Sequence, residues 1–527
     1  MELAKLIDGL SRATAYSHPV ASVAVCQTHI SVVFLAGNFA YKIKKPVQFP
    51  FADFSTLEKR RFYCEEEVRL NRRLAPDVYL GVVPVTLTDG APTFADDGEP
   101  VEWAVRMQRL PAEATLHERL RHGGVSVELV ETLAQRIAAF HRVAPADPQR
   151  AALGNFAAVA QNIRDIYRQA GPHVGQTLSQ AVYDQLQALH EAALTRWQPV
   201  IEGRAARGVP RDCHGDLHLD HIYHFPDRPP PGDLVVVDCI EFNERFRFID
   251  PVADLAFAVM DFAFHARADL ADVLTEGYFR ATGDDEGRAL LPSYAAYRAA
   301  VRGTVEGLKL AEPEMPAADR GATLRDARAH WLLALRLLEA PHRGPCLLLV
   351  GGLPGTGKST LAQGLAAEAG FTPLRCDVVR KELADLPETQ FTPPELRDKL
   401  YSPAMTDRTY AETLRRAEAL LFAGQRVLVD GTFREEHRRK TFLEAAQRWG
   451  VPTLLLLTSA RSETVKQRID QRRGDASDAD WSIHQLLAQG WEPPGAASLP
   501  HVRTIPTDGS REEALRHALQ ELNQSGL

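Results

Sequence analysis

Hydrophobic and polar residues alternate in two runs over residues 20–45. The segments THISVVFLA and FAYKIKK flank Gly37-Asn38, a pair typical of tight turns, and together they predict a β-hairpin. VYLGVVPVTL and VEWAVRMQRL predict two more strands, and an apolar stripe among many charges predicts a helix over residues 56–75. The pattern therefore indicates an α+β lobe at the start of the chain.

Helical spacing of apolar residues dominates the next part of the chain. VELVETLAQRIAAFHRV is amphipathic, and residues 155–206 and 290–339 are rich in helical patterns. Between them lie the histidine-rich segment DCHGDLHLDHIYHF, a proline-rich turn and the apolar strand LVVVD. We expect a helical lobe that follows the α+β lobe.

The pattern changes after a short connector, APHRGP, near residues 340–345. The runs CLLLVG, RVLVD and TLLLLT predict strands that alternate with the predicted helices STLAQGLAAEA, EEHRRKTFLEAAQRW and SETVKQRIDQRR. Such alternation indicates parallel βαβ units. Residues 386–403 interrupt it and are expected to form a loop or lid. We predict two domains, residues 1–340 and 341–527.

Composition narrows the class of protein. A chain of 527 residues exceeds what one core supports, and 45% hydrophobic with 25% charged residues is typical of soluble proteins. The net charge of −8 argues against a nucleic-acid partner. Six cysteines without a C-x-x-C pair indicate reduced thiols, and we find neither a signal peptide nor an apolar run long enough for a membrane helix. We expect a cytoplasmic protein without a membrane partner; its oligomeric state is not indicated.

A phosphate-binding motif follows the first strand of the second domain. GLPGTGKS fits G-x-x-x-x-G-K-[ST], with a predicted strand before it and a predicted helix after it. Glycines allow backbone N–H groups to converge on phosphates at the start of a helix. We expect Lys358 to reach the β- and γ-phosphates and the Ser359 hydroxyl to bind Mg²⁺. The expected nucleotide-binding residues are Gly352, Gly355, Thr356, Gly357, Lys358, Ser359 and Thr360.

Three features downstream extend this site. In D-x-x-R, the Asp377 carboxylate could take a proton from an acceptor hydroxyl while Arg380 clamps a phosphate; the alternative is a helix-capping Asp with a solvated Arg. Asp430 ends a predicted strand where a carboxylate can hold the magnesium shell, unless it is only a turn residue. Arg468 and Arg472 share a predicted helix face, which is either a lid over the nucleotide or a solvated basic face.

These motifs, over about residues 345–505, resemble the P-loop kinases that include polynucleotide-kinase-like and zeta-toxin-like proteins, with an AAA-type ATP-binding domain. The resemblance implies an α/β fold with a parallel sheet that binds ATP and Mg²⁺. It also implies that Asp377 and Arg380 bind the acceptor hydroxyl beside Lys358.

A second constellation lies in the first domain. The H-G-D motif that ends at Asp216, followed by an apolar strand that ends at Asp238, resembles the aminoglycoside phosphotransferase and protein-kinase-like fold, over about residues 20–310. The resemblance implies a bilobal fold in which Asp216 orients or deprotonates the acceptor hydroxyl and Asp238 binds Mg²⁺. The segment FIDPVADLAF looks similar too, with Asp250 and Asp254 as structural carboxylates.

The same resemblance implies a nucleotide-binding lysine and its carboxylate partner. Lys42 lies on the second strand of the predicted hairpin, and Lys44 is a rival on the same strand face. Glu67, on the following helix, is the expected partner of that lysine, and Glu66 is the alternative.

The first domain departs from the family in two ways. Its hairpin has no G-x-G-x-x-G loop, and the metal position five residues after Asp216 holds His221 in place of Asn. Imidazole is a poorer Mg²⁺ ligand than an oxygen, so Asp220 substitutes, another metal is used, or the lobe is impaired. A rival interpretation is a transition-metal site, although its spacing fits no known template. Its candidate ligands are His214, Asp216, His218, Asp220, His221 and His224.

We therefore predict an ATP-dependent phosphotransferase with two kinase-type modules, whose P-loop module transfers the γ-phosphoryl group to a hydroxyl of a small-molecule acceptor. The alternative is a nucleotide-switch ATPase with a degenerate, ligand-sensing first lobe. A third hypothesis, phosphorylation of a polynucleotide 5′-hydroxyl, conflicts with the acidic chain.

Overall fold

The structure is a computed structural model that describes residues 2–49, 51–95, 98–147, 149–312, 315–388, 390, 392–471 and 479–527. The chain divides into two compact units. The first comprises Met1–Asn162, Arg196–Ala263 and Arg267–Tyr294, and the second comprises Ile163–Thr195, Phe264–Ala266 and Ala295–Leu527. The second unit thus includes helical segments that precede residue 340, and the predicted domain boundary stays a prediction.

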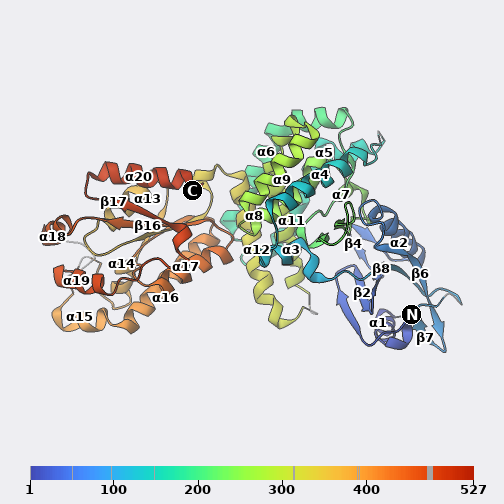
Figure 1. Cartoon of the computed structure of the whole chain (residues 1–527), viewed down its shortest axis with the longest axis horizontal. Helices are drawn as coiled ribbons and strands as arrows, with labels where there is room; N and C mark the ends of the chain where they lie inside the picture. The colour runs from blue at the N-terminus through green and yellow to red at the C-terminus, as the bar shows by residue number, and fades with distance from the viewer. Residues whose placement is uncertain are drawn as a thin grey trace. The chain divides into compact units, whose positions relative to one another are not determined.

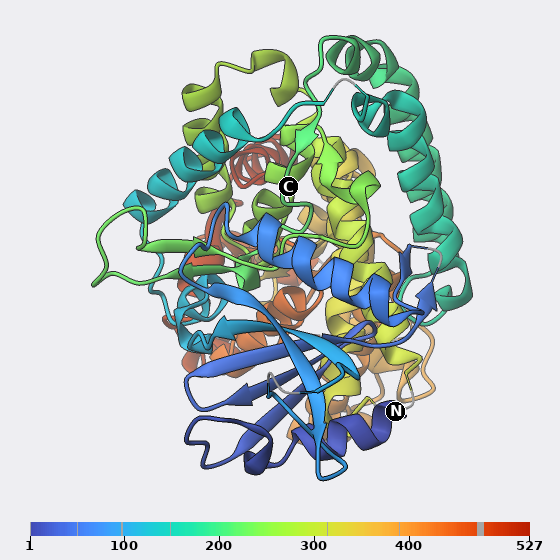
Figure 2. The ribbon, with the colours of Figure 1, turned by 90° about the vertical axis from the view of Figure 1, so that its right-hand side faces the viewer.

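An antiparallel sheet forms one side of the first unit. Its strands, in the order β1-β2-β3-β8-β6-β7, are Val23–Gln27, Ser31–Ala36, Phe39–Lys44, Glu102–Gln108, Tyr79–Thr88 and Ala91–Thr93. The predicted hairpin is confirmed, because Ala36 pairs with Phe39 across the Gly37-Asn38 turn. Helix α2 (Leu57–Asn71) begins where the Thr56 side chain caps it, and it packs against β6 and β8 (Figure 2).

Helices make up most of the rest of the first unit. Helix α4 (Val127–Val143) has the predicted bounds and packs against α9 (Ala268–Thr282). Helix α8 (Pro251–Phe264) is buried along most of its length, which carries its polar residues into the interior. The other elements are α1 Leu3–Leu10, β4 Gln48–Phe49, β5 Ala52–Asp53, α3 Leu116–Arg121, β9 Arg211–Asp212, β10 Ile222–His224, β11 Leu234–Val236, α7 Glu244–Arg247, β12 Phe248–Ile249 and α10 Asp285–Arg288.

Four long helices fill the predicted helix-rich stretches. They are α5 Phe156–Ala170, α6 Gln180–Ala206, α11 Leu291–Leu310 and α12 Ala317–Leu338. Among the residues that the structure covers, no helix combines the length and the apolar character that crossing a bilayer requires.

A five-stranded parallel sheet lies at the centre of the P-loop part of the second unit. Its strands, in the order β14-β15-β13-β16-β17, are Thr372–Arg375, Arg426–Asp430, Cys346–Gly351, Thr453–Ser459 and Val502–Pro506. Helices α13 (Lys358–Ala369) and α20 (Arg511–Gln524) cover one face, and α16 (Pro403–Phe422) and α17 (Glu436–Arg448) cover the other (Figure 1). Because both faces are covered, the strands read as continuous apolar runs, and the predicted α/β fold is confirmed.

Three shorter helices surround the carboxyl ends of these strands: α14 (Cys376–Glu382), α18 (Ser462–Gln471) and α19 (Trp481–Gln489). The expectation that residues 386–403 form only a loop or lid is wrong in part. Helix α15 (Pro394–Leu400) lies within that segment, and its first residue is a proline, which suits the first turn of a helix.

Candidate functional site

The predicted phosphate loop connects β13 to α13. Gly352, Gly355 and Gly357 have φ angles of 137°, 83° and 91°, a region that residues with side chains rarely adopt. A Cβ atom on Gly355 would lie 2.8 Å from Val465 Cγ1 of α18. The glycines therefore provide both the loop conformation and the close approach of α18.

Two neighbouring strands bring the predicted magnesium ligands together. Asp430, at the end of β15, pairs with Val350 near the end of β13 in a parallel register. The Ser359 hydroxyl, at the start of α13, donates a hydrogen bond of 2.6 Å to Asp430 Oδ2. Lys358 Nζ donates to the Leu353 carbonyl oxygen at 3.0 Å. The Asp430 carboxylate thus contacts the first turn of α13, and its role as a magnesium ligand stays a prediction.

Charged groups of both signs surround the Asp430 carboxylate. Burial raises the pKa of Asp430; Lys358 opposes this shift, and the nearby Asp377 carboxylate adds to it. Two carboxylates and a hydroxyl thus meet here, beside the positive charges of Lys358 and Arg375. Hydroxyl and carboxylate oxygens are the ligands that Mg²⁺ prefers, so the residues fit this ion.

A cavity of about 1700 Å³ joins the loop to the predicted acceptor residues. Lys358, Thr360, Asp377, Arg380 and Asp430 all line it. Arg380 is only 8% exposed, and its guanidinium donates to Leu400 O at 3.2 Å and to Thr406 Oγ1 at 3.1 Å. The alternative interpretation of a solvated Arg380 is therefore wrong, whereas its contact with an acceptor stays a prediction.

Arg468 approaches the phosphate loop from α18. One of its terminal nitrogens donates to the Thr507 carbonyl oxygen at 2.6 Å. The other is buried without a hydrogen-bond partner in the described part of the chain, and it lies 3.6 Å from where a Cβ on Gly357 would be. A buried, unsatisfied guanidinium nitrogen beside this loop fits an anionic ligand. Arg472, its predicted companion, lies outside the described residues.

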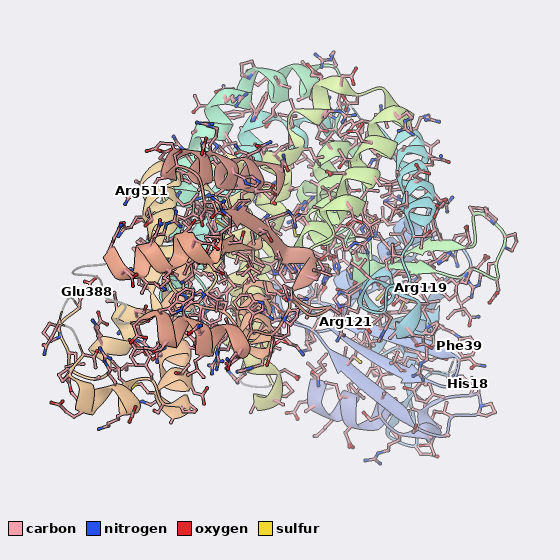
Figure 3. All side chains as sticks on the ribbon, turned by 60° about the vertical axis from the view of Figure 1, so that its left-hand side comes forward. His18, Phe39, Arg119, Arg121, Glu388 and Arg511 are labelled. Carbon is pink, nitrogen blue, oxygen red and sulfur yellow. The ribbon has the colours of Figure 1, made fainter. Side chains whose placement is uncertain are left out.

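The motifs did not indicate several residues of this site. Arg375, at the end of β14, has its Nε 3.6 Å from Asp430 Oδ2 and a terminal nitrogen 3.7 Å from Glu388, which Figure 3 labels. His484 of α19 hydrogen-bonds to the Pro354 carbonyl oxygen at 2.8 Å. Arg511, also labelled in Figure 3, lines the cavity. Of these residues, only Arg375 could have been recognised in the sequence, because it lies at the end of a strand two residues before Asp377.

The first unit contains a separate group of charged residues. Lys42 Nζ lies 2.9 Å from Glu67 Oε1 and donates to Asp238 Oδ1 at 2.6 Å. Burial opposes the charge of Lys42, but Asp238 and Glu67 raise its pKa well above the usual value. Burial likewise opposes ionisation of Asp238, while Lys42 and His221 hold its pKa well below the usual value. The residues predicted to bind nucleotide and metal are thus in mutual contact.

The rival residues occupy different surroundings. Lys44 is fully buried and donates hydrogen bonds to both Glu67 and Glu241. Glu66 instead pairs with Arg69 at 2.7 Å, with Arg69 half exposed. Glu67 is therefore the partner of both lysines. In the part of the chain that the structure describes, only Lys42 of the two forms an ion pair with Asp238.

Asp254 of α8 holds the backbone of the H-G-D loop. Its carboxylate accepts hydrogen bonds from His214 N at 2.9 Å, Gly215 N at 2.7 Å and His141 Nε2 at 3.0 Å. Burial opposes ionisation, yet the hydrogen bond and charge of His141 hold the pKa of Asp254 well below its usual value. Asp250 pairs with Arg204 at 2.6 Å. Asp254 thus contacts the loop itself, whereas Asp250 pairs with a helix residue.

His214 has both ring nitrogens engaged. Its Nε2 donates to the Val237 carbonyl oxygen at 2.9 Å, and its Nδ1 accepts from Asp216 N at 3.2 Å. A carbonyl can only accept, so this network fixes a neutral tautomer. Burial lowers the pKa of His214 to about 4, which agrees with the neutral form. His214 therefore cannot be a metal ligand in this conformation, contrary to the four-histidine interpretation.

Asp216, His218 and His221 form a compact group. They offer ligand atoms that all lie within 4.8 Å of one another, whereas His224 is not among the groups found in the described residues. His221 Nδ1 donates to the Asp216 carbonyl oxygen at 3.0 Å, and His221 Nε2 lies 3.6 Å from Asp238 Oδ2. Because a ring nitrogen faces Asp238 where the family has an amide oxygen, this position does not fit Mg²⁺ well.

Comparisons with known proteins identify a family for each of the two parts of the chain. Residues 59–291 match the family described as "Phosphotransferase enzyme family", and residues 347–494 match "AAA domain". The chain is 33% identical over 478 residues to "Uncharacterized protein Rv2004c" of Mycobacterium tuberculosis, a match that covers 90% of this chain and 92% of the relative. "Uncharacterized protein Mb2027c" of Mycobacterium bovis matches equally.

Solved structures resemble the parts of the chain more distantly. The GDP complex of aminoglycoside 2′-phosphotransferase-IIIa is 15% identical, with 60% of this chain and 94% of that chain covered and a TM-score of 0.38. A sugar kinase from Janibacter sp. HTCC2649 is 19% identical, with 34% and 95% covered and a TM-score of 0.27. From its sequence match, the chain belongs to the family of these mycobacterial proteins, and it carries a phosphotransferase-family domain followed by a P-loop kinase-type AAA domain.

Proposed function

We propose that this protein is an ATP-dependent phosphotransferase whose P-loop domain transfers the γ-phosphoryl group to a hydroxyl of a small-molecule acceptor. The main support is that Lys358, the Ser359–Asp430 pair and Asp377 line one cavity. At about 1700 Å³, this cavity exceeds the roughly 300–1,000 Å³ of a single-ligand pocket. It therefore has room for a nucleotide and a second small molecule.

The residues around the cavity have different roles in the reaction. Lys358 and the amides of the glycine-rich loop neutralise and orient the phosphates. Ser359 and Asp430 would hold Mg²⁺, which when bound neutralises charge on the phosphate oxygens. Asp377 takes the proton from the acceptor hydroxyl as its oxygen bonds to the γ-phosphorus and the bond to the ADP oxygen breaks. Arg380 and Arg468 add positive charge around the transferred group.

The first unit has a second candidate function, which is ligand sensing without phosphoryl transfer. His221 at the expected magnesium position favours it, whereas contact of Lys42 with Glu67 and Asp238 favours a second phosphotransferase module. In that module Asp216 would orient the acceptor hydroxyl. An Asp216→Asn variant tests the choice, because transfer by an active first unit is lost in it and transfer by the P-loop domain is retained.

The function of the P-loop domain is tested with γ-labelled ATP and a metabolite extract. We expect Asp377→Ala to lower the labelled product at least about 100-fold, because the carboxylate that accepts the proton is lost. Binding of Mg·ATP, measured by calorimetry, is expected to persist. Glu382→Gln, on the exposed side of the same helix α14, serves as the matched control. ATP hydrolysis without any labelled product, equal in wild type and Asp377→Ala, would favour a nucleotide switch over a kinase.

A further inference from the structure

The carboxylates and imidazoles beside the H-G-D loop have the composition of a transition-metal site. Asp216, His218 and His221 bring their ligand atoms within 4.8 Å of one another, and Asp238 Oδ2 is 3.6 Å from His221 Nε2. The side chain of His218 is only 6% exposed. Two imidazoles and the Asp216 carboxylate meet here, and Asp238, which follows β11 and pairs with Lys42, lies beside His221.

Hydrogen bonding of His221 selects its ligand atom. Its Nδ1 lies 3.0 Å from the Asp216 carbonyl oxygen and must be the protonated nitrogen, because a carbonyl only accepts. In the neutral ring the lone pair is then on Nε2, which faces the Asp238 carboxylate. Histidines that bind metals commonly donate their other ring N–H to a backbone carbonyl in this way, which fixes the ring orientation.

Distances between these atoms suit one small cation. Ligands of a tetrahedral Zn²⁺ ion lie about 2.0–2.2 Å from the metal and therefore roughly 3.4 Å from one another. His218 Nε2 is 3.6 Å from Asp216 Oδ2, and the ligand atoms of Asp216, His218 and His221 all lie within 4.8 Å of one another. His218 Nδ1 is buried without a hydrogen bond to the residues that the structure describes, and it lies 3.5 Å from Asp220 Oδ2. We expect His218 Nδ1 to hydrogen-bond to Asp220, a carboxylate that would not itself contact the metal.

We propose that Asp216, His218 and His221 bind a borderline divalent transition-metal ion, of the Zn²⁺ or Co²⁺ type, in preference to Mg²⁺. Imidazole nitrogen suits such ions, whereas Mg²⁺ requires oxygen ligands in near-octahedral geometry. The site lies in the first unit and needs no nucleotide. It is therefore independent of phosphoryl transfer by the P-loop domain, and either proposal can fail without the other.

Metal binding is measured on the full-length protein after chelator dialysis and without nucleotide. We expect Zn²⁺ to give a saturable one-to-one heat, and Co²⁺ to give visible absorption bands typical of nitrogen and oxygen ligands. Mg²⁺ is expected to bind at least tenfold more weakly. His221→Asn and His218→Asn should each weaken Zn²⁺ binding at least about tenfold, and His221→Asn should raise the affinity for Mg²⁺ relative to Zn²⁺.

Two controls separate this site from others. His224→Asn, in the same histidine-rich segment, and Ser359→Ala, at the P-loop, should leave Zn²⁺ binding unchanged. Circular dichroism checks that each variant is folded. The proposal is overturned if Zn²⁺ gives no saturable heat, or if both His218→Asn and His221→Asn bind it like the wild type. The two histidines would then serve as hydrogen-bonding or cationic partners of the carboxylates.

Discussion

Lys358→Ala is expected to lower phosphoryl transfer by the P-loop domain roughly a thousandfold, because the variant lacks the ammonium group that neutralises the phosphates. In the structure this group donates to the Leu353 carbonyl oxygen inside the phosphate loop and lines the cavity. The measurement is the initial rate of label transfer from γ-labelled ATP, with Mg·ATP affinity measured in parallel by calorimetry.

A suitable control removes the same charge elsewhere. Lys440→Ala, on the exposed face of α17 beside Glu444, should transfer phosphate like the wild type. Both variants should keep the far-ultraviolet circular dichroism spectrum of the parent. If Lys358→Ala retained wild-type transfer and ATP affinity, the phosphate loop would not be the site of the reaction.

Asp254→Ala should have the second large effect, on the stability of the H-G-D loop. The substitution leaves two buried backbone N–H groups and His141 without their acceptor. Removing one partner from such a buried network costs about 3–5 kcal/mol. Because the protein has two units, the suitable readout is amide hydrogen exchange of residues 213–219 in the whole chain. We expect exchange there to accelerate more than about a hundredfold.

The same carboxylate predicts a pH dependence. Since folding lowers the pKa of Asp254, its contribution is fully present above the pKa of the unfolded carboxyl and is lost as the pH falls through the lower folded value. The difference in protection between wild type and Asp254→Ala should therefore be greatest near neutral pH and shrink in acid. Asp269→Ala, at an exposed pair with Arg267, should change protection little. Equal protection of the loop in Asp254→Ala and wild type at neutral pH would contradict this account.

Local patterns predicted much of the fold. The P-loop, the strand that ends at Asp430 and the amphipathic α4 each rest on spacing within one segment, which a sequence displays directly. Lys42 and Lys44 could not be separated in this way, because residues two apart share a strand face. The two lysines differ because Lys44 pairs with Glu241, a residue far along the chain.

Contacts between residues that are far apart in the sequence could not be predicted. His484 contacts Pro354, and Thr507 donates to the Thr356 carbonyl oxygen, but no motif links these pairs. Helix α15 was missed because prolines and polar residues obscure its short pattern. The roles of Asp377, Arg380 and Asp216 remain predictions, since geometry alone does not show a reaction.

The parallel register of β13 and β15 has a consequence for engineering this protein. Inserting a single residue into β15 would reverse which face each later side chain occupies, and Asp430 would turn away from Ser359. The strands therefore tolerate little change of length. A segment that lines the cavity, such as α15, can be redesigned for a new acceptor while the phosphate-binding frame is left unaltered.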